Sequence, residues 1–475
     1  MCLKKFFQEQ ERKSLIKMLI FSSPEKINRA GEKKLLPAFR RAVRKMPAYG
    51  KILSEKNVIF DQIKNENDFR RMVPIIEKID IFSRFDVEDF SVRGSVEKMI
   101  SAMTSSGFSG VYSFGLTNRK NIKNSARLAD VVLDYTFDIS HKKTLLINCL
   151  PMGVRVFTSL KTVDTSVRDD MVLAVLEKIS PKFEQTLIIG DPHFLKKVAE
   201  AGKEKKINWK KLKISLILGG DWFSESFRSY LAGLIDLDFN NPDGRLIATT
   251  MGVAELDLNL FHESLQTILI RRKAQEDVKF REALFGKDVK AVPIFMHYYP
   301  HRIFLESLPK NSRNGELVFS MLNMDSTVPL MRYNSGDRGQ IFAFDKIKKL
   351  LTDVGYENFI PELKLPMVSV AGRKDRYLKV EKEKKIYPEE IKQGLYENFD
   401  VAFQITGYFR LTDSHGQKKL EIQLKKGLFL NEELKRKIEK SAFRYTETTI
   451  PVEIYEYQRF PYGMELDYER KFINV

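Results

Sequence analysis

The sequence predicts an α/β protein with a large N-terminal domain, in which helices flank mostly parallel layered sheets, and a small α+β C-terminal domain. Three observations predict this fold class. Short apolar runs alternate with segments of helical periodicity before residue 240. A charged stretch without apolar periodicity begins near residue 374. Beyond it, apolar residues alternate along two runs that are separated by a turn.

Three segments have the pattern of strands buried on both faces: 144–148, 186–190 and 214–218. Each is short and nearly continuous in apolar residues, which is typical of a parallel sheet. The apolar residues between 227 and 235 then recur at helical spacing. Gly219, Gly220 and Asp221 follow the third strand, so they lie where doubly wound sheets bind their ligands.

The charged stretch marks a predicted domain boundary, with an N-terminal domain over 1–374 and a C-terminal domain over 375–475. Pro388 is a plausible first residue of a helix. Alternation over 401–411 and again over 420–424, with a turn between them, predicts a β-hairpin. Asn431 is expected to cap a further helix, and residues 451–457 are expected to form a last strand.

Length and composition are those of a globular protein with a large core. The chain has 475 residues, of which 43% are hydrophobic, and no apolar run approaches the roughly 20 residues of a membrane span. The charged segment 1–13 lacks the apolar stretch of a secretory signal, so we expect a cytoplasmic protein. Two cysteines and six histidines without ligand spacing argue against a disulfide framework and against structural zinc.

The net charge of +17 raises the alternative of nucleic-acid binding. The lysine-rich stretches 196–213 and 379–390 contain glutamates, however, and no stretch alternates aromatic with basic residues as a base-stacking surface does. We therefore expect solvated charged faces and no nucleic-acid partner. The sequence leaves the oligomeric state open, a homodimer included.

The stretch Thr104–Gly115, TSSGFSGVYSFG, has the composition of a phosphate-binding loop. Glycines expose backbone N–H groups and serines add hydroxyl donors, and together they can surround an anion. The residues in question are Ser105, Ser106, Gly107, Ser109 and Gly110. A Walker loop is excluded because Leu116 occupies the lysine position. A plain flexible connection remains the alternative.

Four further stretches follow this loop in order: LILGGDWFSES at 216–226, TTMGVAEL at 249–256, MRYNSGDRGQI at 331–341 and VAGRKDRYLKV at 370–380. This order resembles the adenylate-forming (ANL) superfamily, whose small C-terminal domain is mobile. The phenylacetate-coenzyme A ligase branch is the most similar, because RKMPAYGKIL (44–53), MVPIIEKIDIF (72–82) and GVRVFT (153–158) also have counterparts there.

The resemblance implies activation of an aryl or acyl carboxylic acid by ATP and Mg²⁺ to an acyl adenylate. Transfer to coenzyme A would follow, although a carrier-protein thiol or release of the free adenylate shares the same first step. A degenerate relative that binds nucleotide or acyl groups without turnover is the second hypothesis. Val111 favours it by replacing the loop lysine, and Phe108, Asp221, Met251 and Ala254 are further departures.

The resemblance also assigns roles to single residues. Glu255 matches the Mg²⁺-binding glutamate, Asp337 the ribose-binding aspartate and Arg373 a nucleotide-contacting arginine, while Asp375 lies at the hinge and Lys471 is the candidate for the catalytic lysine. The adenine pocket is expected to comprise Gly219, Gly220, Asp221, Met251 and Gly252. The alternative for Glu255 and Lys471 is a solvated side chain, for Asp337 an ordinary turn residue, and for Arg373 a surface ion pair.

The sequence signals for the residues that bind the acid are less specific. Phe157, Thr158 and the aromatic segment 134–140 are candidates for an apolar wall. His262, expected on a helix after Glu255, is a further candidate. Ordinary core packing is the alternative for all of them.

Overall fold

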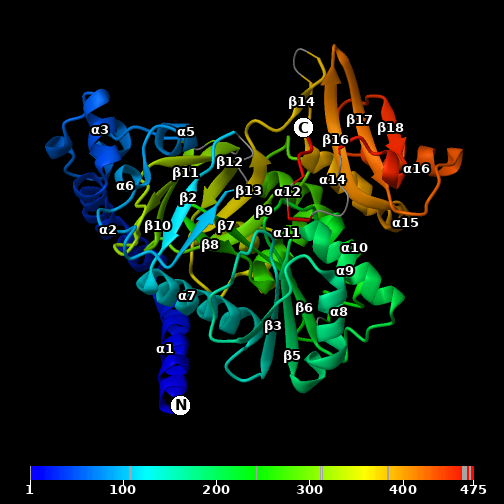
Figure 1. Cartoon of the computed structure of the whole chain (residues 1–475), viewed down its shortest axis with the longest axis horizontal. Helices are drawn as coiled ribbons and strands as arrows, with labels where there is room; N and C mark the ends of the chain where they lie inside the picture. The colour runs from blue at the N-terminus through cyan, green and yellow to red at the C-terminus, as the bar shows by residue number, and fades with distance from the viewer. Residues whose placement is uncertain are drawn as a thin grey trace.

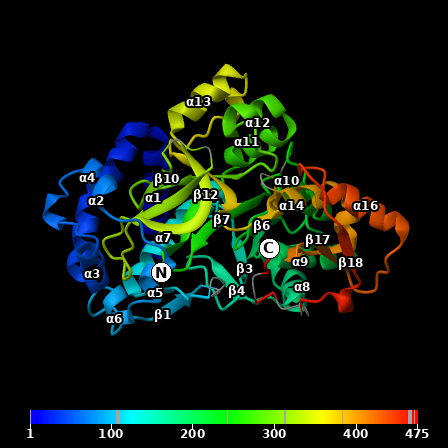
Figure 2. The same cartoon turned by 90° about the horizontal axis from the view of Figure 1, so that it is seen from above.

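The computed structural model describes residues 2–105, 110–241, 243–310, 312, 314–381, 384–462, 468–469 and 472–475 (Figure 1). Its N-terminal helices and its C-terminal part lie at opposite ends of the long axis, with the main sheet between them (Figures 1 and 2). No helix in the described part of the chain has the length and apolar character that a membrane span requires.

A central sheet of eleven strands organises the described residues. Its spatial order is β10 (Ile303–Leu308), β11 (Gly315–Met321), β12 (Tyr333–Phe342), β13 (Met367–Arg373), β9 (Ile294–Tyr298), β8 (Asp257–His262), β7 (Ile247–Val253), β6 (Ile214–Leu218), β5 (Gln185–Gly190), β3 (Thr144–Cys149) and β4 (Lys161–Asp164). Neighbouring strands from β4 to β7 pair in parallel, and those from β7 to β10 pair antiparallel.

The three strands predicted from their apolar runs are confirmed as β3, β5 and β6. Every residue of these strands is buried, which explains why their sequences are apolar on both faces. The helix predicted after them is α10 (Glu225–Leu234). The α/β class is therefore confirmed, with the parallel pairing concentrated in this half of the sheet.

Helices cover the sheet. On the parallel half, α9 (Pro192–Glu204) contacts β5 and β6 and packs against α8 (Asp169–Lys178) and α10. α7 (Arg119–Phe137) packs against β8. The remaining helices of this part are α11 (Leu265–Glu276), α12 (Val278–Phe285), α13 (Phe344–Asp353) and the 3-10 helices Ser180–Lys182 and Glu357–Phe359.

A helical region precedes the sheet and packs on its β10–β12 edge. It comprises α1 (Cys2–Phe21), α2 (Pro24–Lys45), α3 (Pro47–Glu55), the 3-10 helix Phe60–Gln62, α4 (Glu66–Met72), α5 (Lys78–Phe82) and α6 (Val87–Phe90). Most of its buried apolar residues form one cluster with residues between 304 and 333, whereas Leu19 and Ile27 belong to a second cluster with Tyr299 and Leu365. The antiparallel pair β1 (Ser101–Thr104) and β2 (Phe114–Thr117) then carries the serine- and glycine-rich stretch.

The C-terminal part has its own apolar cluster, which begins at Leu378. Its elements are β14 (Leu378–Lys379), β15 (Lys385–Ile386), α14 (Pro388–Glu397), α15 (Phe399–Gln404), β16 (Ile405–Ser414), β17 (Gln417–Leu424), α16 (Glu432–Ala442), β18 (Val452–Tyr455) and the 3-10 helix Tyr457–Arg459. The predicted hairpin, helix start at Pro388, Asn431 cap and last strand are confirmed. The division at 374/375 stays a prediction.

One predicted strand begins later than expected. Residues 401–404 belong to the short helix α15, because the Asn398 side chain accepts hydrogen bonds from the N–H groups of Asp400 and Val401 and thereby caps a helix. The strand β16 starts only at Ile405. Alternation of apolar residues over so short a segment did not distinguish a turn of helix from a strand.

Candidate functional site

A cavity of about 850 Å³ opens at the carboxyl ends of the parallel strands. Its wall combines the serine- and glycine-rich stretch, α7, the turn after β6, the β7–β8 hairpin and the ends of β12 and β13. The C-terminal part contributes Tyr408, Tyr468 and Phe472. The cavity therefore gathers segments that are distant in the sequence, as expected for a doubly wound sheet.

The serine- and glycine-rich stretch reaches the cavity through Ser105 and Val111. The Ser105 hydroxyl accepts a hydrogen bond from the Ser113 N–H at 3.0 Å and lies 2.9 Å from the Lys78 ammonium, which donates to it. Gly110 adopts a φ of +77°, in the region that favours glycine. Ser106, Gly107, Phe108 and Ser109 lie outside the described residues.

Lys78 is a cation at this loop that the sequence analysis did not identify. It is the first residue of α5 and lines the cavity beside Ser105. The only signal for it was its position in the segment MVPIIEK, which was already matched to the phenylacetate-coenzyme A ligase branch. Because Val111 replaces the expected loop lysine, Lys78 supplies a positive charge where the loop sequence has none.

Glu255 lies in the turn between β7 and β8 and is only 6% exposed, so it is not a solvated surface glutamate. Its Oε1 accepts a hydrogen bond of 2.5 Å from the Tyr333 hydroxyl. Burial, and then the Glu255 charge, raise the pKa of Tyr333 well above its usual value, so the tyrosine stays protonated and donates. Gly115 makes this packing possible, since a Cβ there would lie 2.0 Å from the Ala254 carbonyl oxygen.

Glu255 fits the role of a Mg²⁺ ligand. Magnesium prefers carboxylate oxygen and is commonly held by one or two carboxylates together with substrate phosphates. Glu255 Oε1 is held in place by Tyr333 within the cavity wall. No cluster of three or more metal-binding side chains occurs among the residues that the structure describes, and a site shared with a phosphate substrate does not need one.

Asp337 and Arg373 are cross-strand partners on β12 and β13, and both line the cavity. The Ser335 hydroxyl donates to Asp337 Oδ2 at 2.7 Å, and Arg373 Nη1 lies 3.8 Å from Asp337 Oδ1. Arg373 Nε lies 3.6 Å from Asp375, the predicted hinge residue. Gly336, which lies between Ser335 and Asp337 in the chain, has a φ of +81°, and a Cβ there would lie 2.8 Å from Arg373 Nη2.

All five residues predicted for the adenine pocket line the same cavity: Gly219, Gly220, Asp221, Met251 and Gly252. Gly220 adopts a φ of +98° in the turn after β6. A Cβ on Gly252 would lie 2.4 Å from the Leu258 carbonyl oxygen, so only glycine allows the close approach of β7 and β8. Their contact with adenine stays a prediction.

Asp221 is engaged by residues that the sequence analysis did not identify. Lys392 Nζ, from α14, lies 2.6 Å from Asp221 Oδ2, and His193 Nε2 lies 4.0 Å from the same oxygen. Burial alone would raise the pKa of Asp221, but Lys392 and His193 outweigh it and lower the pKa to about 2. Burial and Lys392 lower the pKa of His193 to about 3.

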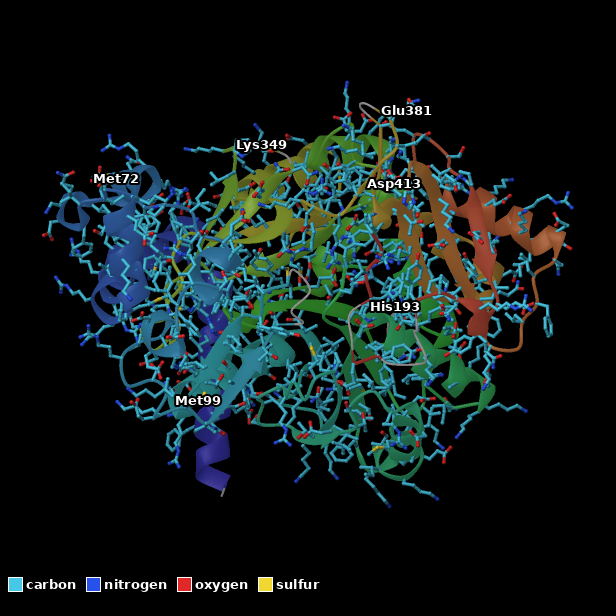
Figure 3. The ribbon with its side chains drawn as sticks, turned by 45° about the horizontal axis from the view of Figure 1, so that its top comes forward. Met72, Met99, His193, Lys349, Glu381 and Asp413 are labelled. Atoms are coloured by element: carbon cyan, nitrogen blue, oxygen red, sulfur yellow. The ribbon has the colours of Figure 1, made fainter. Side chains whose placement is uncertain are left out.

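These contacts join the two parts of the chain. His193 lies where the N-terminal part meets the C-terminal part (Figure 3), with its ring 4.9 Å from that of Tyr408. Lys196 is buried nearby, and it donates to Glu200 at 2.7 Å and to the Ile405 carbonyl at 2.8 Å. Lys196 lies in a lysine-rich stretch and Lys392 follows another. Because both resemble solvated lysines in the sequence, their buried contacts were not predicted.

Some of the residues predicted to bind the acid line the cavity and one does not. Phe157 lines the cavity, as do Thr136 and Phe137 of the aromatic segment. Thr158 is not among the described residues that line it, and its hydroxyl donates to Asp130 at 2.5 Å. His262 lines the cavity, but it ends β8 rather than lying on a helix. The helix α11 starts one turn later because Ser264 caps it.

Lys471 lies outside the described residues. Nearby Tyr468 and Phe472 line the cavity, and Glu469 accepts a hydrogen bond of 2.6 Å from Ser166. Asp375 lines the cavity mouth with a side chain that is 64% exposed.

No model of a known protein family matches the chain, and no curated protein matches it either. Several solved structures are similar to it in fold. The 2-hydroxyisobutyryl-CoA ligase in its postadenylation state, in complex with R3-HIB-AMP, superposes with a TM-score of 0.70 at 13% identity, over 96% of this chain and 91% of that chain. The same ligase with 2-HIB-AMP gives a TM-score of 0.67 at 14% identity, over 91% and 86%.

The same ligase in its thioesterification state, with 2-HIB-AMP and CoA, gives a TM-score of 0.55 at 14% identity, over 92% of this chain and 87% of that chain. These similarities extend over nearly the whole chain, and they agree with the order of motifs in the sequence. The chain has the same fold as these 2-hydroxyisobutyryl-CoA ligase structures.

Proposed function

We propose that the protein is an adenylate-forming acid–thiol ligase, which activates an aryl or acyl carboxylic acid with ATP and passes the acyl group to a thiol such as that of coenzyme A. The convergence of Glu255, Asp337 and Arg373 on one cavity carries this proposal. These residues come from three separate motifs, and the fold brings them together with the glycine turn after β6.

Asp337 and Arg373 are the proposed nucleotide anchors. An ionised carboxylate accepts hydrogen bonds from two adjacent ribose hydroxyls, and charge-assisted bonds of this kind are among the strongest available to a protein. Arg373 contributes a positive charge beside the same position. Ser335 holds one Asp337 oxygen, which fixes the orientation of the carboxylate.

Lys78, Ser105 and Glu255 are proposed for the triphosphate. Lys78 compensates for the loop lysine that Val111 replaces, because it already donates to the loop hydroxyl of Ser105. Glu255 would hold Mg²⁺, which when bound neutralises phosphate charge and orients the leaving group. The hydrogen bond from Tyr333 keeps the carboxylate pointed into the cavity.

The proposed reaction has two displacements. A carboxylate oxygen of the acid attacks the α-phosphorus of ATP, the bond to the β-phosphate breaks, and pyrophosphate leaves. The thiol sulfur then attacks the acyl carbon and loses its proton, the bond from that carbon to the AMP oxygen breaks, and AMP leaves. Both steps bring anions together, so fixed positive charges that meet the developing charge lower the barrier.

The proposal assigns the C-terminal part, from residue 375 onward, the role of a mobile lid with Lys471 as its catalytic cation. Tyr468 and Phe472, close to Lys471 in the sequence, line the cavity. The better superposition on the postadenylation state than on the thioesterification state agrees with a lid that moves between the half-reactions. A carrier-protein thiol is an alternative acceptor.

One observation favours the second candidate, a binding protein without turnover. Asp221, which replaces the family's glutamate, is occupied by Lys392 from the C-terminal part. Together with Val111 and Met251, this pair would suit a protein that holds nucleotide without moving its lid.

Exchange of labelled pyrophosphate into ATP tests the proposal. The panel consists of isobutyric, hexanoic and phenylacetic acids, each beside its hydroxy derivatives, since similar solved structures contain a hydroxyacyl adenylate. We expect exchange that depends on one class of acid and on Mg²⁺. Absence of exchange with every acid, together with ATP binding in calorimetry, would instead support the binding protein.

A further inference from the structure

His262 is a buried polar side chain to which the described residues offer no hydrogen-bond partner. It ends β8, is 1% exposed and lines the cavity. Among the described residues, neither of its ring nitrogens has a partner. Buried polar groups in folded proteins are nearly always hydrogen-bonded, because desolvation without a partner is costly. An imidazole with two unpaired nitrogens in a cavity wall is therefore suited to a ligand.

The described residues around His262 are aromatic rings, a second histidine and apolar side chains, and burial is the one cause that shifts its pKa. Tyr299 stacks on its ring at 5.2 Å with an interplanar angle of 19°. The neighbouring His297 has its ring 5.7 Å away, but its Nε2 pairs with the Ser264 hydroxyl at 3.2 Å. Apolar residues of α7, which packs on β8, form this side of the cavity, among them Ala129 and Val132.

The charge state of His262 restricts what it can bind. Burial lowers the pKa of His262 to about 3, so the imidazole is neutral at physiological pH, with one N–H donor and one acceptor nitrogen. A second carboxylate of a ligand would be buried there without a counter-charge. A hydroxyl, a carbonyl or an amide matches the donor and the acceptor.

We infer that the acid bears a neutral hydrogen-bonding group, such as a hydroxyl or carbonyl, on its acyl part, and that His262 is the specificity-determining residue that binds this group. The inference rests on the proposed function, because it identifies the cavity around His262 with the acyl pocket. It goes beyond that function by naming the class of acid. A site built around a hydrogen bond rejects an analogue that lacks the group far more strongly than an apolar pocket rejects an added methylene.

The test compares matched pairs of acids on three variants. Phenylacetic acid is set against its 2-, 3- and 4-hydroxy derivatives, and hexanoic acid against hydroxyhexanoic acids, both in pyrophosphate exchange and in calorimetric binding. His262→Phe keeps a ring and removes hydrogen bonding, whereas His262→Gln keeps hydrogen bonding. Met296→Leu changes another cavity-lining residue, on β9, without altering any hydrogen bond.

The wild type is expected to favour the hydroxylated member of at least one pair by tenfold or more. His262→Phe should bring that ratio close to one, His262→Gln should retain a preference, and Met296→Leu should shift both members alike. If His262→Phe does not fold, as judged by thermal unfolding, His262→Leu gives the same comparison.

Two outcomes overturn the inference: no preference within any pair by either method, or an equal loss for both members in His262→Phe. The two methods separate this inference from the proposed function. A preference in binding that depends on His262, without any exchange, supports the inference while contradicting the ligase. Exchange without such a preference supports the ligase and contradicts the inference.

Discussion

At the scale of single residues, the site depends on charged side chains that neighbours hold in place. Asp337 is fixed by Ser335 and flanked by Arg373, and Glu255 is held by Tyr333. In each case a hydroxyl group, from Ser335 or Tyr333, orients the carboxylate without neutralising it, and Arg373 adds a positive charge beside Asp337. Such prior orientation is what a site that stabilises developing charge requires.

Replacing Asp337 by Asn keeps the shape of the side chain and removes its charge. Hydrogen bonds to charged groups contribute about 1.5–3 kcal/mol each, so the affinity for ATP should fall by about tenfold or more. Isothermal titration with ATP measures this change. Ser335→Ala is the matched control and should have a smaller effect, and unchanged affinity in Asp337→Asn would show that the nucleotide binds elsewhere.

Lys78 is expected to bind the outer phosphates. Lys78→Met should weaken binding of ATP more than binding of AMP, because AMP lacks the phosphates that this ammonium would reach. Titration of both nucleotides gives the ratio directly. Lys51→Met removes another lysine, one whose partner is Asp89 on the surface, and should leave both affinities unchanged. Equal weakening of ATP and AMP in Lys78→Met would contradict the assignment.

At the scale of elements, we expect the stability of the contact between α14 and the turn after β6 to depend on pH. The pKa of Asp221 is lowered to about 2, because Lys392 and His193 outweigh its burial. A depressed carboxylate pKa contributes stability that is present above the unfolded pKa, about 3.9, and is lost as pH falls toward the folded value.

Asp221→Asn should therefore be less stable than the wild type near pH 7, where it leaves Lys392 buried without its counter-charge. The loss should be about 3–5 kcal/mol if the pair behaves as other broken buried pairs do. The difference in unfolding temperature should shrink between pH 4 and pH 2, as the wild-type carboxyl becomes protonated. A difference that stays constant over this range would show that the ion pair does not form.

Several elements could be predicted from the sequence because one physical signal determined each of them. The strands β3, β5 and β6 are apolar on both faces, and the Asn431 cap is a local hydrogen bond. Val401 and Phe403 were assigned to a strand because their short alternation also fits one turn of helix, and the Asn398 cap selects the helix. His262 was assigned to a helix because the Ser264 cap that starts α11 was not recognised.

The parts of the site that sequence reasoning missed are made by tertiary contacts. Lys392 meets Asp221 across 171 residues of chain and Lys78 meets Ser105 across 27. The local sequence does not distinguish Lys392 from a solvated lysine, and the only signal for Lys78 is its position in the segment MVPIIEK. Glu255, Asp337 and Arg373 were predicted because each lies within a motif whose order along the chain is informative.

At the scale of the whole molecule, the account requires a lid that acts in one half-reaction and withdraws for the other. Lys471→Ala should strongly reduce adenylate formation and leave thioester formation from a supplied acyl adenylate largely intact. Single-turnover measurements of each half-reaction test this. Lys437→Ala, which removes an exposed lysine paired with Glu433 within α16, serves as the control. Equal losses in both half-reactions would rule out Lys471 as the adenylation cation.

The central claim is that the carboxylate of an acid attacks the α-phosphorus of ATP. An acid labelled with ¹⁸O at both carboxyl oxygens, incubated with ATP, Mg²⁺ and coenzyme A, tests this most directly, with mass spectrometry of the AMP produced. Because the carboxylate oxygen stays on phosphorus when the thiol displaces AMP, the account predicts one ¹⁸O atom in each AMP. Unlabelled AMP, or label in inorganic phosphate, would contradict it.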